Sequence, residues 1–292
     1  MNPIARSWLF VPGDDERKIA RGLSGAADAV ILDWEDAVAT SRKEDARRIT
    51  CQVLDETSPS GNRRWIRLNG MDTPAFEDDL QALPAAQVEG VVLPKARGPQ
   101  ALADLDRRLA QVENAAGVPV GRLKVMGIVT EDAASVLALS EFRQPVPRLV
   151  ALLWGGEDLA ADLGIRHNRD DAGHYRATFR LARDLTLLAA GAARAAAIDA
   201  VYTDVRNLEC LRQESEQAVA DGFAGKAAIH PDQVAVIRAA FEPDAQQVDW
   251  ARRVVEALSN EAGVALLDGK MIDRPHLRLA KRILGLAPDG SS

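Results

Sequence analysis

The sequence predicts an α/β fold: a (β/α)8 TIM barrel followed by a C-terminal helical lid or arm. The first observation is length, because 292 residues suit one barrel with a short extension. The second is an alternation of short apolar runs with amphipathic segments, which is typical of repeated βα units. The third is that eight such runs occur before residue 242, while no glycine-rich phosphate loop opens a helix. A closed barrel is therefore favoured over a doubly wound open sheet.

Each apolar run has the length of a buried strand, and each is followed by a helical pattern. The expected strands are residues 7–12, 29–34, 64–69, 90–94, 123–130, 149–154, 198–202 and 225–229. The expected helices are residues 14–24, 41–56, a short helix from about 74, then 99–114, 131–140, 175–197, 207–221 and 231–241. Residues 1–241 are therefore expected to form the barrel.

The pattern changes in residues 242–292, which are expected to form a separate extension. Residues 246–262 read as an amphipathic helix, 265–270 as a short extended piece, and 273–284 as a basic helix with Pro275 near its first turn. The last six residues are expected to fray. A barrel does not need this segment. We expect it to cover the active site, either in its own subunit or as an arm onto a neighbouring one; the alternative is that it only covers the barrel surface.

The composition narrows the class of protein. Hydrophobic residues make up 47% of the chain and charged residues 27%, so a full core can be buried. A net charge of −7 argues against nucleic acid or an anionic membrane surface as the main partner. Cys51 and Cys210 are too few and too far apart for a disulfide framework, so a reducing cytoplasm is expected. No apolar window is long enough to span a membrane, and the N-terminus reads as folded protein.

Two glycines and three acids follow the sixth predicted strand. Gly155 and Gly156 suit the tight turn where a strand passes into a loop. Glu157, Asp158 and Asp162 come directly afterwards. One interpretation is a helix N-terminus, where acids cap free N–H groups and complement the dipole. The other is that Asp158 is a metal ligand at the carboxyl end of a barrel strand, where (β/α)8 enzymes place their chemistry.

Glu131 ends the neighbouring fifth strand, so its carboxylate and that of Asp158 can converge on one cation. Two carboxylates, completed by waters and substrate oxygens, commonly hold Mg²⁺. Zinc is not expected, because no His/Cys cluster has suitable spacing. The alternative for Glu131 is a place in the N-cap region of the following helix.

Arg67 interrupts an otherwise apolar strand. A buried guanidinium needs anionic partners, either substrate oxygens or, as the alternative, one of the neighbouring acids. Glu35 and Asp36 follow the second strand, with Lys43 and Arg47 one helical turn apart behind them, and these four could equally form a charge network that stiffens the loop. Other polar residues at or near strand ends are Arg6, Asp33, Asn69, Lys95 and His230.

These residues resemble the HpcH/HpaI aldolase/citrate lyase β-subunit-like family, which includes malyl-CoA and citramalyl-CoA lyases. The resemblance runs in order from Arg6 to about Leu284, and Trp34 stands where an aliphatic residue is more usual. The matching pieces are Arg6-Ser7 with Phe10-Val11-Pro12-Gly13, Asp33-Trp34-Glu35-Asp36-Ala37-Val38 with Lys43 and Arg47, Arg67-Leu68-Asn69, Leu93-Pro94-Lys95, Glu131, Gly156-Glu157-Asp158-Leu159 through Asp162-Leu163-Gly164, Gly225-Lys226, Ile229-His230-Pro231 and residues 269–275.

The resemblance implies a trimeric or hexameric barrel that makes or breaks a carbon–carbon bond. It assigns Glu131 and Asp158 as ligands of Mg²⁺, with Mn²⁺ as a substitute, and Arg67 as the group facing the keto-acid oxygens. It implies that Asp273 exchanges a proton with the acyl carbon of a thioester, commonly in a neighbouring subunit's site. It implies that Glu35 and Asp36 do not bind the metal directly but bond to its waters. The other residues expected around the metal or the substrate are Arg6, Lys43, Arg47, Lys95, Gly156 and Glu157.

The implied function is a Mg²⁺-dependent lyase that cleaves a 3-hydroxyacyl-CoA, such as citramalyl-CoA, malyl-CoA or a citryl-type thioester, to acetyl-CoA and a 2-oxo acid. The implied partners are thus a CoA thioester and a 2-oxo acid. Three alternatives stay open: a class II pyruvate aldolase, a malyl-CoA thioesterase, and a citrate lyase β-like subunit that depends on a carrier protein. Spacing alone indicates only an acidic, Mg²⁺-binding barrel mouth with one buried arginine.

Overall fold

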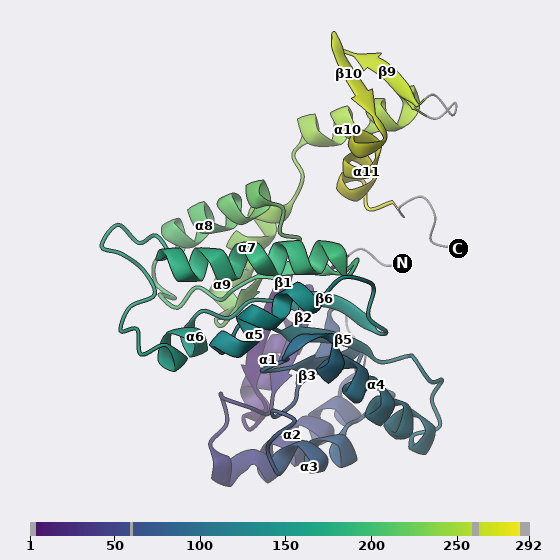
Figure 1. Ribbon diagram of the computed structural model, residues 1–292. Helices are drawn as coiled ribbons and strands as arrows, with labels where there is room; N and C mark the ends of the chain where they lie inside the picture. Colours follow the sequence, from purple (N-terminus) through teal and green to yellow (C-terminus); the bar gives the residue numbers. More distant parts are fainter. Residues whose placement is uncertain (1–3, 59–60, 259–262, 287–292) are drawn as a thin grey trace. The chain divides into compact units, whose positions relative to one another are not determined.

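The structure, a computed structural model, describes residues 4–58, 61–258 and 263–286. The chain divides into two compact units (Figure 1). Residues Ala5–Phe241 form the first unit, and the described residues from Glu242 onward belong to the second. Among the described residues, no helix combines the length and the apolarity that crossing a membrane requires.

The first unit is a closed barrel, as the sequence predicted. In the part of the chain that the structure describes, eight parallel strands pair in sequence order, and the last pairs with the first. Because all strands run the same way, their carboxyl ends share one mouth. The strands are β1 (Ser7–Pro12), β2 (Ala29–Asp33), β3 (Arg63–Arg67), β4 (Gly90–Leu93), β5 (Lys124–Ile128), β6 (Leu149–Leu153), β7 (Ala196–Asp199) and β8 (Gly225–Ala228).

Helices follow the strands and surround them, which gives the barrel its outer layer (Figure 1). They bury one apolar face each, as α1 does with Ile19 and Leu23. The helical segments are α1 (Glu16–Ser24), η1 (Thr40–Arg42), α2 (Lys43–Glu56), α3 (Ala75–Ala82), α4 (Gly98–Ala115), α5 (Ala133–Ala138), η2 (Leu139–Glu141), α6 (Glu157–Asp162), α7 (Ala177–Ala192), α8 (Leu208–Asp221) and α9 (Pro231–Phe241).

The boundary between α7 and β7 differs from the predicted one. The sequence predicted a helix through residue 197, because an alanine-rich run favours a helix. The helix instead ends at Ala192, and β7 begins at Ala196, where it pairs with Ala151 of β6. Tertiary pairing therefore overrides local propensity here.

A buried charge network lies between the last two strands and their helices. Asp199 at the end of β7 is fully buried and accepts hydrogen bonds from the Lys226 ammonium at 2.7 Å and from Arg183 Nε at 2.9 Å. The Trp154 indole N–H donates to the same carboxylate at 2.7 Å. These cations hold the pKa of Asp199 at about 2, so the acid stays charged despite its burial.

The second unit contains α10 (Ala245–Ala257), an antiparallel hairpin of β9 (Val264–Leu267) and β10 (Lys270–Asp273), and α11 (Arg274–Ile283). The sequence predicted one extended piece at 265–270, and that prediction was wrong. The chain turns back at Asp268 and Gly269, which both have positive φ. Ala251, Val254 and Ile272 lie in a small apolar core of this unit. The predicted helix end at 258–262 and the predicted fraying of 287–292 fall partly or wholly outside the described residues. That this unit is a lid or arm stays a prediction.

Candidate active site

Arg67, the last residue of β3, lies at the mouth of the barrel with its side chain largely buried. Its Nε donates to Asp33 Oδ1 at 2.7 Å and its Nη2 donates to Asp33 Oδ2, so the pair is bidentate. Its Nη1 lies 2.8 Å from Glu35 Oε2, and the Phe10 ring centroid lies 5.0 Å from Cζ. The carboxylates raise the pKa of Arg67 even though burial opposes them, so the side chain is a fixed cation.

Asp33 is a residue whose role the sequence analysis did not assign. It is fully buried, and the β2–β3 register pairs it with Arg67. It also accepts backbone N–H bonds from Glu35 at 2.8 Å and Ala37 at 3.1 Å. Asp33 therefore orients the guanidinium and shapes the acidic loop after β2 at the same time. The available signal was an acid at the end of one apolar strand and an arginine at the end of the next; only the strand register shows that the two are level.

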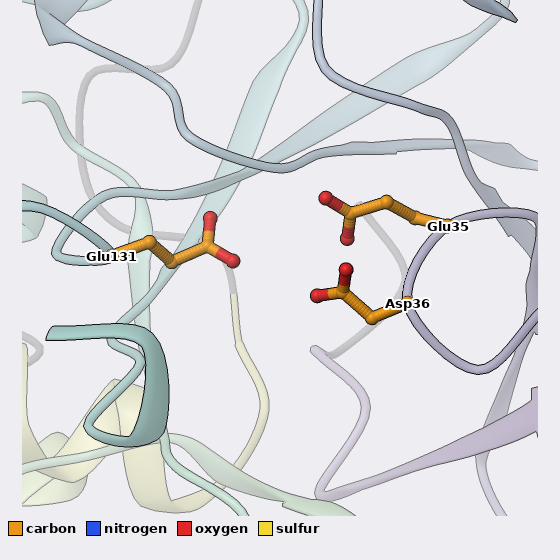
Figure 2. Close-up of side chains that lie close together, drawn as sticks. All are labelled: Glu35, Asp36 and Glu131. Atoms are coloured by element: carbon orange, nitrogen blue, oxygen red, sulfur yellow. The ribbon is translucent and has the colours of Figure 1, made fainter. Parts of the chain in front are cut away.

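Three carboxylates from two loops converge at the mouth. Glu35, Asp36 and Glu131 each offer an oxygen, and these oxygens all lie within 4.8 Å of one another. Figure 2 shows the Glu131 carboxylate directed toward those of Glu35 and Asp36, which come from the opposite side. The resemblance implied that Glu35 and Asp36 bond only to the waters of the metal; the structure brings them as close to Glu131 as a shared cation would require.

Glu131 carries a strongly shifted pKa. Burial raises the pKa of this carboxyl to about 8; the charges of Glu35 and Asp158 add to the shift, and a hydrogen bond from the Lys95 backbone N–H opposes it. Lys95 has a left-handed backbone conformation, with φ of 50°, and its N–H is directed at the Glu131 carboxylate. Its ammonium also donates to Glu35 Oε1 at 3.0 Å.

Asp158 is the second residue of α6 and is half-buried. Its pKa is raised by burial and by the nearby charge of Asp36. Asp158 is not one of the three acids whose oxygens lie within 4.8 Å of one another, but its charge acts on Glu131. The charge of Asp158 therefore raises the pKa of the other predicted ligand, Glu131. The charge of Glu35 also acts on Glu131, and the charge of Asp36 acts on Asp158.

The donor set suits a hard divalent cation. Oxygen donors from several carboxylates are what Mg²⁺ prefers. Glu35 Oε2 is buried, and its contact with Arg67 Nη1 at 2.8 Å is an ion pair without hydrogen-bond geometry. Among the described side chains at the mouth, the acids Asp33, Glu35, Asp36, Glu131 and Asp158 face the cations Arg67 and Lys95. An added cation would relieve that excess of negative charge.

Lys43 and Arg47 act behind the acidic loop. The Lys43 ammonium donates to the backbone C=O groups of Trp34 and Glu35, each at 2.9 Å, and so supports the loop. Arg47 instead pairs with Asp79 at 2.9 Å on α3. The prediction that Arg47 belongs with the acids at the mouth is not supported: its partner Asp79 is buried and holds the Asn69 backbone N–H at 2.7 Å.

Arg6, Gly156 and Glu157 have partners other than the three converging acids. Arg6 precedes β1, so it stands at the amino end of the strands, and its backbone N–H donates to Asp28. This end of the barrel is opposite the mouth, so the expectation that Arg6 lies around the metal or the substrate is corrected. Gly156 packs against the Trp154 ring, 3.1 Å from where a Cβ would stand. Glu157 accepts a hydrogen bond from Asn168 at 2.8 Å and lines a different cavity.

Two other residues from the sequence analysis have local partners. Trp34 is fully buried, and its indole N–H donates to Thr50 at 3.0 Å. Asp273 belongs to the second unit, where it ends β10 and lies 2.6 Å from His276 Nδ1. The predicted role of Asp273 toward a substrate stays a prediction.

A closed (β/α)8 barrel with a fixed arginine and converging carboxylates at its mouth defines a TIM-barrel enzyme with an acidic active site. The particular family follows from the sequence as a whole. The chain belongs to the HpcH/HpaI aldolase/citrate lyase family, whose sequence model matches residues 6–231.

Relatives with curated names cover almost the whole chain. A citrate lyase subunit beta-like protein of Mycobacterium tuberculosis is 36% identical, over 98% of this chain and 96% of its own length. A (3S)-malyl-CoA thioesterase of Cereibacter sphaeroides is 36% identical, over 97% and 94%. The mitochondrial citramalyl-CoA lyase of Mus musculus is 32% identical, over 97% and 86%.

A solved structure supports the same relationship. The crystal structure of protein CitE from Mycobacterium tuberculosis, in complex with magnesium, acetoacetate and coenzyme A, superposes with a TM-score of 0.73. It is 34% identical in sequence and covers 97% of each chain.

Proposed function

We propose that this protein is a Mg²⁺-dependent carbon–carbon lyase that cleaves a 3-hydroxyacyl-CoA to acetyl-CoA and a 2-oxo acid. The observation that carries the proposal is the convergence of Glu131, Glu35 and Asp36, with Asp158 nearby, beside the fixed cation of Arg67. Relatives named citramalyl-CoA lyase and citrate lyase beta-like support the reaction class. The complex of CitE with magnesium and coenzyme A supports the metal and the thioester.

Glu131 and Asp158 would hold the metal, with Glu35 and Asp36 close enough to bind it directly or through water. When bound, Mg²⁺ supplies Lewis-acid stabilisation of negative charge on the substrate oxygens. Binding would also require Glu131 to lose the proton that its environment favours. Burial and neighbouring negative charges destabilise the ionised forms of Glu131 and Asp158. One bound cation would offset this destabilisation for the whole group of acids.

Arg67 would stabilise negative charge on the oxygens that become those of the 2-oxo acid when the carbon–carbon bond breaks. Its Nε and Nη2 are committed to Asp33, so the guanidinium cannot rotate, and Nη1 is the group directed at the acidic cluster. A donor fixed before the reaction has little reorganisation left to undergo, which is the general basis of electrostatic catalysis. Phe10 covers one face of the guanidinium and limits its contact with water.

Asp273 would exchange the proton at the methyl carbon of acetyl-CoA. That role requires the second unit to reach an active site, either in the same subunit or in a neighbouring one. This reach, and assembly into a trimer or hexamer, are both part of the proposal. The hydroxyacyl group remains open between citramalyl-CoA, malyl-CoA and a citryl-type thioester.

One assay tests the reaction. The purified protein, with Mg²⁺ and separately with a chelator, is given citramalyl-CoA or malyl-CoA, and acetyl-CoA, free CoA and 2-oxo acids are followed. The lyase proposal predicts acetyl-CoA with pyruvate or glyoxylate, and only with Mg²⁺. Free CoA with intact hydroxy acid would instead indicate a thioesterase, an activity named for the Cereibacter relative. No reaction with any thioester would favour the aldolase or the carrier-dependent subunit.

A further inference from the structure

Two hydrogen-bonded ties join the loop after β5 to the segment after β6. In the first, the Thr130 hydroxyl accepts from the Gly155 backbone N–H at 2.8 Å and donates to the Gly155 C=O at 3.0 Å. In the second, Asp162 Oδ2 accepts from the Ala133 backbone N–H at 2.8 Å. None of these four residues belongs to the acidic cluster.

The two ties bracket both predicted metal ligands along the chain. Glu131 lies between residues 130 and 133, and Asp158 lies between residues 155 and 162. Each ligand therefore stands on a short segment that is fastened to the other segment at both ends. The distance between two groups held in this way depends on the ties as well as on the barrel.

The hydrogen bonds between Thr130 and Gly155 continue the pairing of β5 and β6 beyond the ends of the two strands. The β5–β6 register closes with Ile128 opposite Leu153, and the Val129 N–H makes the next bond to the Leu153 C=O at 3.0 Å. At the next residue along the chain, the Thr130 side chain makes both bonds to Gly155. Thr130 is fully buried, so its hydroxyl has these bonds in place of water.

Glu131 also packs directly on this tie. A Cβ at Gly155 would stand 3.3 Å from Glu131 Cγ and 3.5 Å from a methyl carbon of Ile128, so the absence of a side chain at Gly155 leaves room for the glutamate. The Lys95 backbone N–H holds the carboxylate end of the same side chain. Glu131 is thus fixed at its stem by Gly155 and at its head by Lys95.

We propose that Thr130 and Asp162 are positioning residues that set the separation of Glu131 and Asp158, and through it the affinity for the metal. The inference rests on the proposed function for the identity of the ligands. It adds two side chains that lie outside the group of converging carboxylates. Partners of this kind, which orient metal ligands, typically change metal affinity about 10- to 100-fold when removed.

The test compares Mg²⁺ affinities measured by isothermal titration calorimetry. Thr130→Val keeps the shape but removes the hydroxyl, and we expect it to weaken Mg²⁺ binding about tenfold or more. Thr130→Ser keeps the hydroxyl and should bind as the wild type does. Thr186→Val is the matched control, because Thr186 on α7 is also fully buried and its hydroxyl donates to Ala182 at 2.8 Å. It should lower the melting temperature without changing Mg²⁺ affinity.

The second tie gives an independent variant. Asp162 is exposed, so Asp162→Ala should fold normally and still weaken Mg²⁺ binding several-fold. It decides the question if Thr130→Val does not fold. In both variants the Mg²⁺ concentration for half-maximal turnover should rise, while kcat at saturating Mg²⁺ stays near that of the wild type. A purely structural defect would lower kcat and stability together.

Asp158→Ala separates this inference from the proposed function. If Asp158→Ala loses Mg²⁺ binding while Thr130→Val and Asp162→Ala bind it with wild-type affinity, the ties have no positioning role and the metal site stands. If Asp158→Ala binds Mg²⁺ as the wild type does, the ligand assignment is wrong and the inference fails with it.

Discussion

Replacing Glu131 by glutamine should stabilise the metal-free protein, and the gain should grow with pH. The folded-state pKa of Glu131 is raised to about 8 from an ordinary 4.5. The folded state therefore keeps a proton that the unfolded chain releases between these values. It binds more protons than the unfolded state, so the free energy of unfolding falls as pH rises from 4.5 to 8. Below pH 4.5 both states are protonated, and the penalty disappears.

The magnitude follows from the two pKa values. One pKa unit corresponds to about 1.4 kcal/mol, so the penalty is about 1 kcal/mol at pH 5 and about 3 kcal/mol at pH 7. Glutamine has nearly the same shape, and its carbonyl oxygen can still accept the Lys95 N–H. It cannot ionise, so Glu131→Gln should exceed the wild type in stability by about these amounts.

The measurement is urea unfolding in the presence of a chelator, at pH 5 and pH 7 and at one protein concentration. Glu157→Gln is the matched control, because this exposed acid on α6 bonds to Asn168 and lies outside the cluster. It should change stability little at either pH. A Glu131→Gln advantage that is the same at both pH values, or that is absent at pH 7, would refute the reasoning.

Three further predictions concern turnover. Asp158→Ala should abolish Mg²⁺-dependent turnover in the thioester assay, whereas Glu157→Ala, its neighbour on α6, should retain it; wild-type activity of Asp158→Ala would contradict its assignment as a ligand. Arg67→Lys keeps the charge but cannot form the two hydrogen bonds to Asp33, so kcat/KM should fall roughly 100-fold. A change of less than threefold would show that the fixed orientation of the guanidinium is unimportant. Asp273→Asn should suppress deuterium exchange at the acetyl-CoA methyl, followed by NMR, without changing Mg²⁺ affinity; unchanged exchange would remove Asp273 from its proposed role.

The barrel was predictable because its signals are local and repeated. Each strand is a short apolar run, each helix has one apolar face, and eight repeats of the pair leave few other folds. One error occurred where the local signal is weak, because alanine residues near 195 fit a helix or a strand and only pairing with β6 decides between them. The other error overlooked a local signal. The hairpin of β9 and β10 reverses at Asp268-Gly269, a dipeptide that favours a two-residue hairpin turn, which the apolar pattern alone does not mark.

The candidate site was predictable in its residue types and less so in its pairings. An arginine in an apolar strand and acids after three strands indicated an electrostatic site at the mouth. The bond between Arg67 and Asp33 depends on the register of β2 and β3, which the sequence does not display. The positions of Arg6, at the other end of the strands, and of Arg47, paired with Asp79, likewise depend on where the elements meet in space.

The closed barrel, the family, and the acids and arginine at one end of the barrel follow from the order of residues alone, because periodicity and strand order are properties of the chain. The folded molecule was needed to show that Glu35 and Asp36 face Glu131 and that Asp33 fixes Arg67. It was also needed to show that Glu131 is buried deeply enough for its pKa to rise to about 8. The distances between charges, and how far solvent is excluded from between them, are set only when distant segments of the chain pack together.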